Sequence, residues 1–294
     1  MRRRPFGGTG LEVPVLGFGA MQVGDPSLAE RDAARVLNAA LDAGLTLIDT
    51  ARSYGLAEER IGRHLAARRD EFLLSTKVGY GIDGVTDWSY DCVIAGVDAA
   101  RERLRTDVID IVHLHSCGVE TLVDGGVTRA LLRSAELGKL RVAAYSGDGQ
   151  ALRWAAESGS FRGLQASVNL CDQQGLELLE DARSRRIGTI AKRPLAGRPW
   201  ATLAPPEDSV HREYWRRFDE LSAVLDAGQA DWDALALRFA AYAPGVDCCI
   251  VGGTDIRHIF QNVENAAAGP LAAPEFAALR DAFARVGSQW PGQV

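Results

Sequence analysis

The stretch LAERDAARVLNAALDAGLTLID (residues 28–49) contains a helix pattern followed directly by a strand pattern. Apolar side chains recur with the period of an α-helix over Leu28–Ala43, and Gly44 then supplies the residue type that commonly ends a helix. The run Thr46–Asp49 is short and apolar, which is typical of a buried strand. A helix joined through a glycine to a short buried strand belongs to a βαβ unit and predicts a parallel sheet.

The same alternation continues along the chain. Short apolar runs predict eight strands, at Val15–Ala20, Thr46–Asp49, Phe72–Lys77, Ile109–His115, Leu140–Ser146, Gly163–Val168, Gly188–Arg193 and Asp247–Gly252. Helical patterns lie between them, at Leu28–Ala43, Glu58–Ala67, Tyr90–Arg105, Val127–Leu137, Gln150–Ser158, Leu176–Arg186 and Trp232–Tyr242. This order predicts an α/β fold, a (β/α)8 TIM barrel in a single domain covering residues 1–294. An open doubly wound sheet stays an alternative on strand count alone.

Two segments lie outside this alternation. Met1–Val13, with its glycine-rich turn, predicts an N-terminal hairpin before the first barrel strand. Residues 195–231 are longer than an ordinary connection between strand and helix, and prolines make the first part irregular. Long connections at the C-terminal face of a barrel are usually functional, so we expect this loop to border the site.

Composition and charge limit the class of protein. The net charge of −6 argues against a nucleic-acid partner, which would need concentrated positive charge. The basic run Arg2–Arg4 is not followed by an apolar stretch, so we expect neither a signal peptide nor a membrane segment. The five cysteines are scattered, without spacing suited to disulfides or zinc, and this favours reduced thiols in the cytoplasm.

Ionisable residues end three consecutive predicted strands: Asp49, Lys77 and His115. Tyr54 lies just beyond Asp49, and in a barrel such strand ends meet at one face. Asp49 and Lys77 could simply compensate each other's charge. They could also carry out carbonyl reduction, which needs hydride at carbon and a proton at oxygen. A phenol, with an ordinary pKa near ~10, becomes a useful acid when a neighbouring ammonium stabilises its phenolate, and a histidine can hydrogen-bond the substrate oxygen.

His113 and His115 form a His-x-His pair on one strand face, which also suggests half of a metal-hydrolase site. The remaining ligands are missing from the other predicted strand ends, so we expect no metal. His113 is interpreted as a hydrogen-bonded histidine of the barrel interior, one layer below the site.

Four blocks in order resemble the aldo-keto reductase family: LGFGAM (16–21), LIDTARSYGLAEERIG (47–62), LSTKVG (74–79) and IDIVHLHS (109–116). The resemblance extends from Arg4 to Asn262. It implies a (β/α)8 barrel, a nicotinamide cofactor across the barrel mouth, and a catalytic tetrad of Asp49, Tyr54, Lys77 and His115, with Tyr54 as proton donor. Its implied substrate is a small-molecule aldehyde, ketone or alcohol. Barrels of this family also serve as non-enzymatic regulatory subunits, so that alternative stays open. A monomer is the expected state.

The resemblance also implies cofactor contacts after several strands. Ala20 and Met21 would line the pocket near the nicotinamide. Ser146 and Gln165 match positions that hold the carboxamide, whereas Gly147 replaces the family's asparagine. Lys192 occupies the position of a stacking aromatic residue. Arg193 and Arg198 would meet the pyrophosphate, although these cations could also be solvated on their loop.

The run Val251–His258 leads into a helix, and its glycine-rich start favours phosphate binding through backbone N–H groups. We expect Gly252, Gly253 and Thr254 to contribute there. Asn262 matches the family's adenine-side pattern, Gln261 stands where glutamate is common, and Arg257 is a candidate partner for a 2′-phosphate. NADP(H) is the family's default cofactor. Because the family's usual cations are replaced, NAD(H) stays an alternative.

The substrate pocket is expected in three loops, residues 79–89, 116–126 and 195–231. Trp88 and Trp200 are its candidate apolar walls. A structural role is at least as common for such aromatic residues. The sequence does not fix the conformations of these loops.

Overall fold

The computed structural model describes residues 1–225 and 230–293. Eight parallel strands close into a barrel in the order β10-β3-β4-β5-β6-β7-β8-β9, which confirms the predicted (β/α)8 fold and excludes the open sheet. The strands are β3 (Leu16–Gly19), β4 (Leu47–Asp49), β5 (Leu73–Val78), β6 (Ile109–His115), β7 (Leu140–Ser146), β8 (Gly163–Ser167), β9 (Gly188–Lys192) and β10 (Cys248–Gly252). Each predicted strand agrees with the observed one to within a residue at either end.

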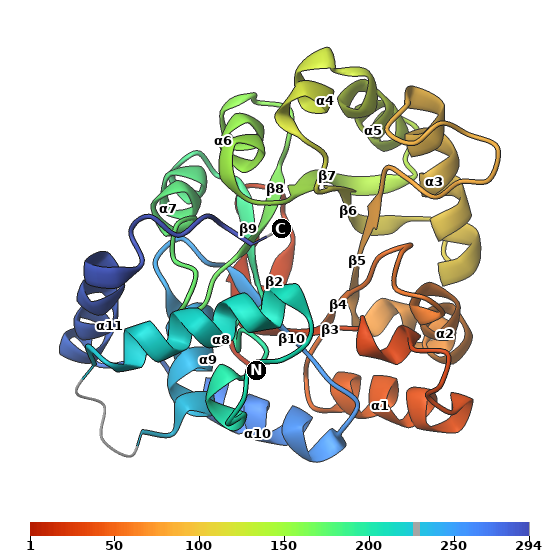
Figure 1. Cartoon of the computed structure of the whole chain (residues 1–294). Coiled ribbons are helices and arrows are strands. Elements are labelled where there is room, and N and C mark those ends of the chain that lie inside the picture. The colour runs from red at the N-terminus through yellow and green to blue at the C-terminus, as the bar shows by residue number, and fades with distance from the viewer. Residues whose placement is uncertain (226–229, 294) are drawn as a thin grey trace.

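Helices surround the barrel, as Figure 1 shows. Those anticipated from the sequence are α1 (Glu30–Asp42), α2 (Ala57–His64), α3 (Tyr90–Leu104), α5 (Gly126–Glu136), α6 (Gly149–Glu157), α7 (Leu176–Ser184), α9 (Trp232–Tyr242) and α10 (Ile256–Ala267). The connections add α4 (Val119–Asp124), α8 (Ser209–Ser222) and α11 (Ala273–Val286), with short 3-10 turns η1 (Gln22–Gly24), η2 (Ala66–Glu71) and η3 (Pro199–Ala201). The predicted loop 195–231 therefore contains a 14-residue helix, and residues 226–229 of that loop lie outside the described part.

The N-terminal hairpin, β1 (Arg3–Pro5) and β2 (Glu12–Pro14), is antiparallel as expected. Phe6 follows β1, is fully buried, and belongs to an apolar cluster with Leu47 of β4 and Ile190 of β9. An added Cβ at Gly188, the first residue of β9, would lie 2.5 Å from the Phe6 ring. Glycine at this position therefore makes room for Phe6, which fixes the hairpin against the barrel.

All five cysteines are buried and unbonded to one another. Cys248 belongs to the cluster around Phe6 and Cys249 to the larger core, so the two point to opposite faces of β10. Burial raises the pKa of Cys117 to about 12 and raises the pKa values of the other four thiols. The helices in the described ranges are all too short or too polar to cross a bilayer.

Candidate active site

The residues that end the barrel strands surround one cavity of about 560 Å³. Asp49 ends β4, Lys77 lies near the end of β5, and His115 ends β6. Tyr54 reaches the same cavity from the connection between β4 and α2. Parallel closure of the barrel places these strand ends on one face, so the structure brings together all four residues that the sequence pattern singled out.

Asp49 and Lys77 form a buried ion pair at the base of the cavity. Lys77 Nζ lies 2.6 Å from Asp49 Oδ2, and each side chain is only 2% exposed. Lys77 also donates to the backbone oxygen of Thr50, at 2.8 Å. Burial alone would lower the pKa of Lys77, but the Asp49 carboxylate and Tyr54 outweigh it and raise that pKa above its ordinary value. The ammonium therefore remains charged.

Two further donors hold the Asp49 carboxylate in place. Ser75 Oγ donates to Oδ1 at 2.7 Å, and Gln165 Nε2 donates to the same oxygen at 2.9 Å. Burial would raise the pKa of Asp49, and the nearby Lys77 lowers it below its ordinary value. The carboxylate thus remains ionised, with its hydrogen-bonding capacity largely used within the site.

Tyr54 lies beside both Lys77 and His115. Lys77 Nζ is 5.0 Å from the centre of the Tyr54 ring, and the Tyr54 and His115 rings meet edge to face with centroids 6.0 Å apart. Burial, followed by the charge of Lys77, lowers the pKa of His115 to about 3. His115 is therefore a neutral imidazole near pH 7, able to donate from one ring nitrogen and accept at the other.

His113 lies one layer deeper and is fully buried. Its Nε2 is 3.1 Å from Ser75 Oγ, whereas its Nδ1 has no hydrogen-bond partner in the described part of the chain. The expectation of a fully hydrogen-bonded interior histidine is thus met at one nitrogen only. Residues 1–225 and 230–293 contain no cluster of three or more His, Cys, Asp or Glu side chains that could hold a metal.

Ser146 and Gln165 lie together in the cavity, with Ser146 Oγ donating to Gln165 Oε1 at 2.9 Å. Gly147, which departs from the family pattern, has a local explanation. An added Cβ there would lie 2.4 Å from the hydroxyl oxygen of Tyr145, which donates to the backbone oxygen of Cys117 at 2.7 Å. Tyr145 therefore occupies the space that an asparagine at position 147 would need.

The cations after β9 also line the cavity, but each already has a partner. Lys192 Nζ lies 3.1 Å from Asp148, an ion pair that the sequence did not reveal. Arg193 donates to the backbone oxygen of Gln293 at 2.5 Å, and Arg198 pairs with Asp233 at 2.6 Å. Any anionic group that binds here must compete with these contacts or add to them.

The other predicted cofactor positions divide into two groups. Met21 and Gly252 line the cavity, and Ala20 is fully buried directly before Met21. The remaining positions are not among its lining residues: Gly253, Thr254, Arg257, Gln261 and Asn262. The Arg257 side chain is 89% exposed and pairs with Asp255 at 2.7 Å. Gln261 donates to Asn265, and Asn262 is buried on α10.

Neither candidate tryptophan lines the cavity. Trp200 packs against Phe218 and Trp232, and its Nε1 donates to Asp233 at 2.8 Å. Trp88 packs against Tyr80 with ring centroids 5.4 Å apart. Tyr80 itself lines the cavity, although no sequence motif indicated it. Its only sequence signal is an aromatic residue shortly after the strand that carries Lys77.

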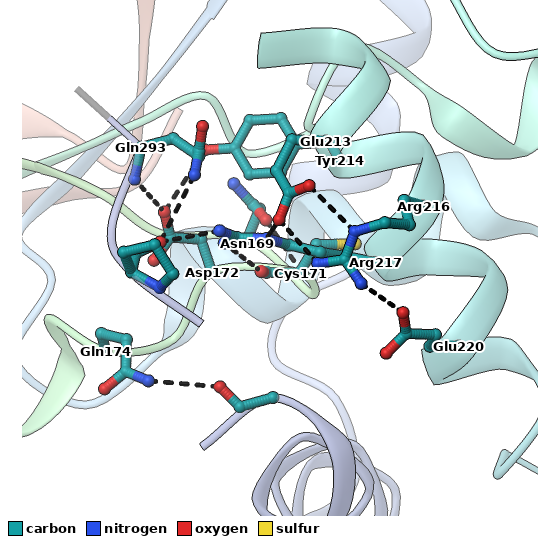
Figure 2. Close-up of polar contacts among 12 residues, drawn as sticks. Asn169, Cys171, Asp172, Gln174, Glu213, Tyr214, Arg216, Arg217, Glu220 and Gln293 are labelled. Atoms are coloured by element: carbon teal, nitrogen blue, oxygen red, sulfur yellow. Dashed lines mark hydrogen bonds and ion pairs between the residues drawn. The ribbon is translucent and has the colours of Figure 1, made fainter. Parts of the chain in front are cut away.

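The C-terminal segment lies against the loop that follows β8, where Figure 2 shows Gln293 beside Asp172. The backbone N–H of Gln293 donates to Asp172 Oδ2 at 3.0 Å, and Ser167 Oγ at the end of β8 donates to the Gln293 oxygen at 3.1 Å. Arg217 of α8 is fully buried and donates to the backbone oxygen of Pro291 at 2.8 Å. These contacts tie α8 to the C-terminal segment and that segment to the end of β8 and the loop after it, and no sequence motif anticipated them.

Comparison with known proteins agrees with this geometry. The sequence model of the Aldo/keto reductase family matches residues 15–283. L-galactose dehydrogenase of Arabidopsis thaliana is 27% identical over 283 residues, covering 88% of this chain and 86% of that protein. D-threo-aldose 1-dehydrogenase of a Pseudomonas species is 26% identical and covers 88% of this chain and 91% of its own.

The fold agrees as well. An aldo-keto reductase from Bacillus halodurans, solved in its holo form, superposes with a TM-score of 0.82 at 25% identity, covering 96% of each chain. The match to the family model extends over the whole barrel, and the two relatives named above are dehydrogenases. Over 42% of its length the chain is also 31% identical to a probable voltage-gated potassium channel subunit beta of Arabidopsis thaliana. The chain therefore belongs to the aldo/keto reductase family and is an NAD(P)-dependent oxidoreductase.

Proposed function

We propose that this enzyme reduces an aldehyde or ketone to an alcohol, or catalyses the reverse reaction, with Tyr54 as the proton donor. One observation carries the proposal: Tyr54, the buried Asp49–Lys77 ion pair and the neutral His115 share one cavity. The nicotinamide cofactor supplies or removes hydride at the carbonyl carbon when it is bound. The side chains of the chain handle the proton and position the substrate oxygen.

The proposed roles follow from charge. When Tyr54 gives its proton to the substrate oxygen, a phenolate remains, and the Lys77 ammonium stabilises that negative charge. Asp49 keeps Lys77 charged and in place through their 2.6 Å contact. His115, neutral near pH 7, donates an N–H to the substrate oxygen and fixes its approach. A positioned acid of this kind typically accelerates a reaction by about 10²–10⁴-fold.

The donor set fits a nicotinamide carboxamide. Gln165 uses one amide hydrogen on Asp49 and keeps a second, while Ser146 Oγ keeps capacity to accept a hydrogen bond. An amide ligand needs such a donor and such an acceptor. Ala20 and Met21 would border the ring. The missing asparagine at position 147 leaves this contact with one side chain fewer.

We propose that phosphate groups are held by the cations Lys192, Arg193 and Arg198 and by backbone N–H groups of Gly252, Gly253 and Thr254. Arg257, Gln261 and Asn262 would form the adenosine side. NADP(H), the default cofactor of the family, is the proposed cofactor. NAD(H) is the alternative, because Arg257 is committed to Asp255 in this structure.

The substrate is proposed to be a small carbonyl compound or alcohol. The names of two relatives refer to L-galactose and D-threo-aldose, so aldoses belong in a first screen. Trp88 and Trp200 remain candidate walls only if the loops around them rearrange, since neither lines the cavity here. We propose a monomer that works in the cytoplasm.

The decisive experiment combines binding and turnover. NADPH and NADH are titrated by fluorescence, and aldehydes, ketones and aldoses are then screened with each cofactor. We expect binding of at least one cofactor and measurable reduction by the wild type. Tyr54→Phe should lose nearly all reduction while its cofactor affinity is unchanged, because only the proton donor is removed. Normal turnover by Tyr54→Phe would refute the proposed mechanism.

A further inference from the structure

Tyr80, two residues beyond the end of β5, makes two contacts with His115. Its hydroxyl oxygen lies 2.9 Å from His115 Nδ1, and the two rings stack with centroids 5.5 Å apart and planes 24° apart. Its ring also packs against Trp88. Tyr80 therefore holds the His115 ring through both packing and a hydrogen bond.

The hydrogen bond bears on which nitrogen of His115 carries hydrogen. A neutral imidazole has a single N–H, and the partner of one nitrogen decides the state of the other. Nδ1 faces the Tyr80 hydroxyl, whereas Nε2 has no hydrogen-bond partner among residues 1–225 and 230–293. For Nε2 to donate to a substrate oxygen in the cavity, Nδ1 must accept a hydrogen bond.

Ser53 completes a chain of hydroxyl groups. The Tyr80 hydroxyl donates to Ser53 Oγ at 3.0 Å in this structure, and Ser53 is exposed to solvent. Rotation of the two hydroxyl groups reverses this hydrogen bond. When Ser53 donates to Tyr80, the Tyr80 hydrogen is directed at His115 Nδ1, because each hydroxyl has only one hydrogen to donate. Ser53 and Tyr54 are neighbours on the connection after β4, so one loop carries both the proposed acid and the start of this chain.

We propose that Tyr80 is a positioning residue that fixes His115 in the tautomer with hydrogen on Nε2, aimed at the substrate oxygen. This inference rests on the proposed carbonyl reduction. By microscopic reversibility, alcohol oxidation uses the same arrangement: His115 Nε2 donates to the alcohol oxygen while the Tyr54 phenolate accepts the hydroxyl hydrogen. Tyr80 then acts in both directions without touching substrate.

The first test is kinetic. Tyr80→Phe keeps the ring between His115 and Trp88 and removes only the hydroxyl. We expect kcat for carbonyl reduction to fall about tenfold, the effect of losing one hydrogen bond at a neutral group, with cofactor affinity unchanged. The matched control is Tyr90→Phe at the start of α3, whose side chain lies outside the cavity and should leave kcat unchanged.

The second test reads the tautomer itself. Histidine is labelled with ¹⁵N in the cofactor-bound wild type and in Tyr80→Phe, and the signals of His115 are assigned with His115→Gln. We expect hydrogen on Nε2 in the wild type and a mixture of tautomers in the variant. A purely structural role for Tyr80 would leave the tautomer unmoved.

The outcomes separate the two proposals. If the wild type turns over and Tyr80→Phe changes neither kcat nor the ¹⁵N signals, the inference about Tyr80 is overturned and the proposed function stands. Hydrogen on Nδ1 in the cofactor-bound wild type that is poised for reduction also overturns it. A wild type that reduces no carbonyl compound refutes the proposed function, and the spectra then still decide whether Tyr80 sets the tautomer.

Discussion

The buried charge of Lys77 contributes both to the stability of the fold and to the proposed chemistry. Lys77→Met would leave the Asp49 carboxylate buried without its cation, which typically costs about 3–5 kcal/mol of folding free energy. We also expect carbonyl reduction to be abolished and cofactor binding to stay nearly intact. Urea unfolding and fluorescence titration measure the two effects separately.

The control is the double variant Lys77→Met with Asp49→Asn, which removes both charges. It should recover most of the lost stability without recovering activity, because a neutral amide can be buried at lower cost than a lone carboxylate. Equal instability of the single and double variants would contradict the assignment of the loss to an unpaired charge.

Some site residues could be predicted from the sequence because strand ends fix their positions. Asp49 and His115 end parallel strands and Lys77 lies one residue before the end of another, so closure of the barrel alone brings them together. Tyr80 and the pair Lys192–Asp148 could not be predicted in this way, since their contacts depend on side-chain directions across different strands. The reason why glycine replaces the family's asparagine at position 147 becomes clear only once the packing of Tyr145 against it is known.

At the scale of elements, the N-terminal hairpin covers the end of the barrel opposite the cavity, and Phe6 is the side chain that packs there. Phe6→Ala would leave a void in the cluster that includes Leu47 and Ile190, and such truncations cost about 3–5 kcal/mol. We expect a clear drop in Tm, with cofactor affinity unchanged well below the new Tm. Thermal unfolding followed by circular dichroism measures the first and fluorescence the second.

Phe260→Ala is the comparison for stability, because Phe260 is 48% exposed on α10 and its removal leaves no enclosed void. Its effect on unfolding should be within about 0.5 kcal/mol. A similar loss of unfolding free energy in both variants would show that the burial of Phe6 does not stabilise the fold more than an exposed phenylalanine does.

Elements were predicted well where periodicity and glycine stops coincide, as in α1 followed by β4. The connections were predicted less well. Within residues 195–231, prolines at the start indicated an irregular loop, yet α8 forms further along, capped at its start by the Asp208 side chain. Arg217 on that helix is stabilised by distant backbone oxygens of Cys171 and Pro291, contacts that no local pattern reveals.

At the scale of the whole molecule, buried titratable groups set the dependence of stability on pH. Burial lowers the pKa of His113 to about 4 and contributes to lowering that of His115 to about 3, against about 6.5 for an unfolded histidine. At these two histidines the folded protein therefore binds fewer protons than the unfolded chain below about pH 6.5. The stability from His113 is full above about pH 6.5 and is lost as the pH falls toward 4.

His113→Gln should weaken the dependence of the unfolding free energy on pH in this acid range. The loss of unfolding free energy between pH 6.5 and 4 should shrink by about 3 kcal/mol, whatever the absolute stability of the variant. Urea unfolding at a series of pH values measures the slope. An unchanged slope would mean that the pKa of His113 is the same in the folded and the unfolded protein.

Asp172 acts in the opposite sense. Burial raises its pKa to about 6, so its contribution to stability is present at low pH and is lost as the pH rises through 6. Asp172→Asn removes that contribution and should therefore make the acid loss of stability steeper than in the wild type. The same titration tests it, and a flatter curve would contradict the raised pKa.

The five buried cysteines have a practical consequence for site-specific labelling of this chain. Thiols with raised pKa values and no solvent access react slowly with maleimides and other alkylating probes. A single new cysteine placed on an exposed position, such as Leu203 in the connection after β9, would take up a fluorophore or spin label specifically. The chain can thus be labelled at a single chosen position while all five native cysteines are kept.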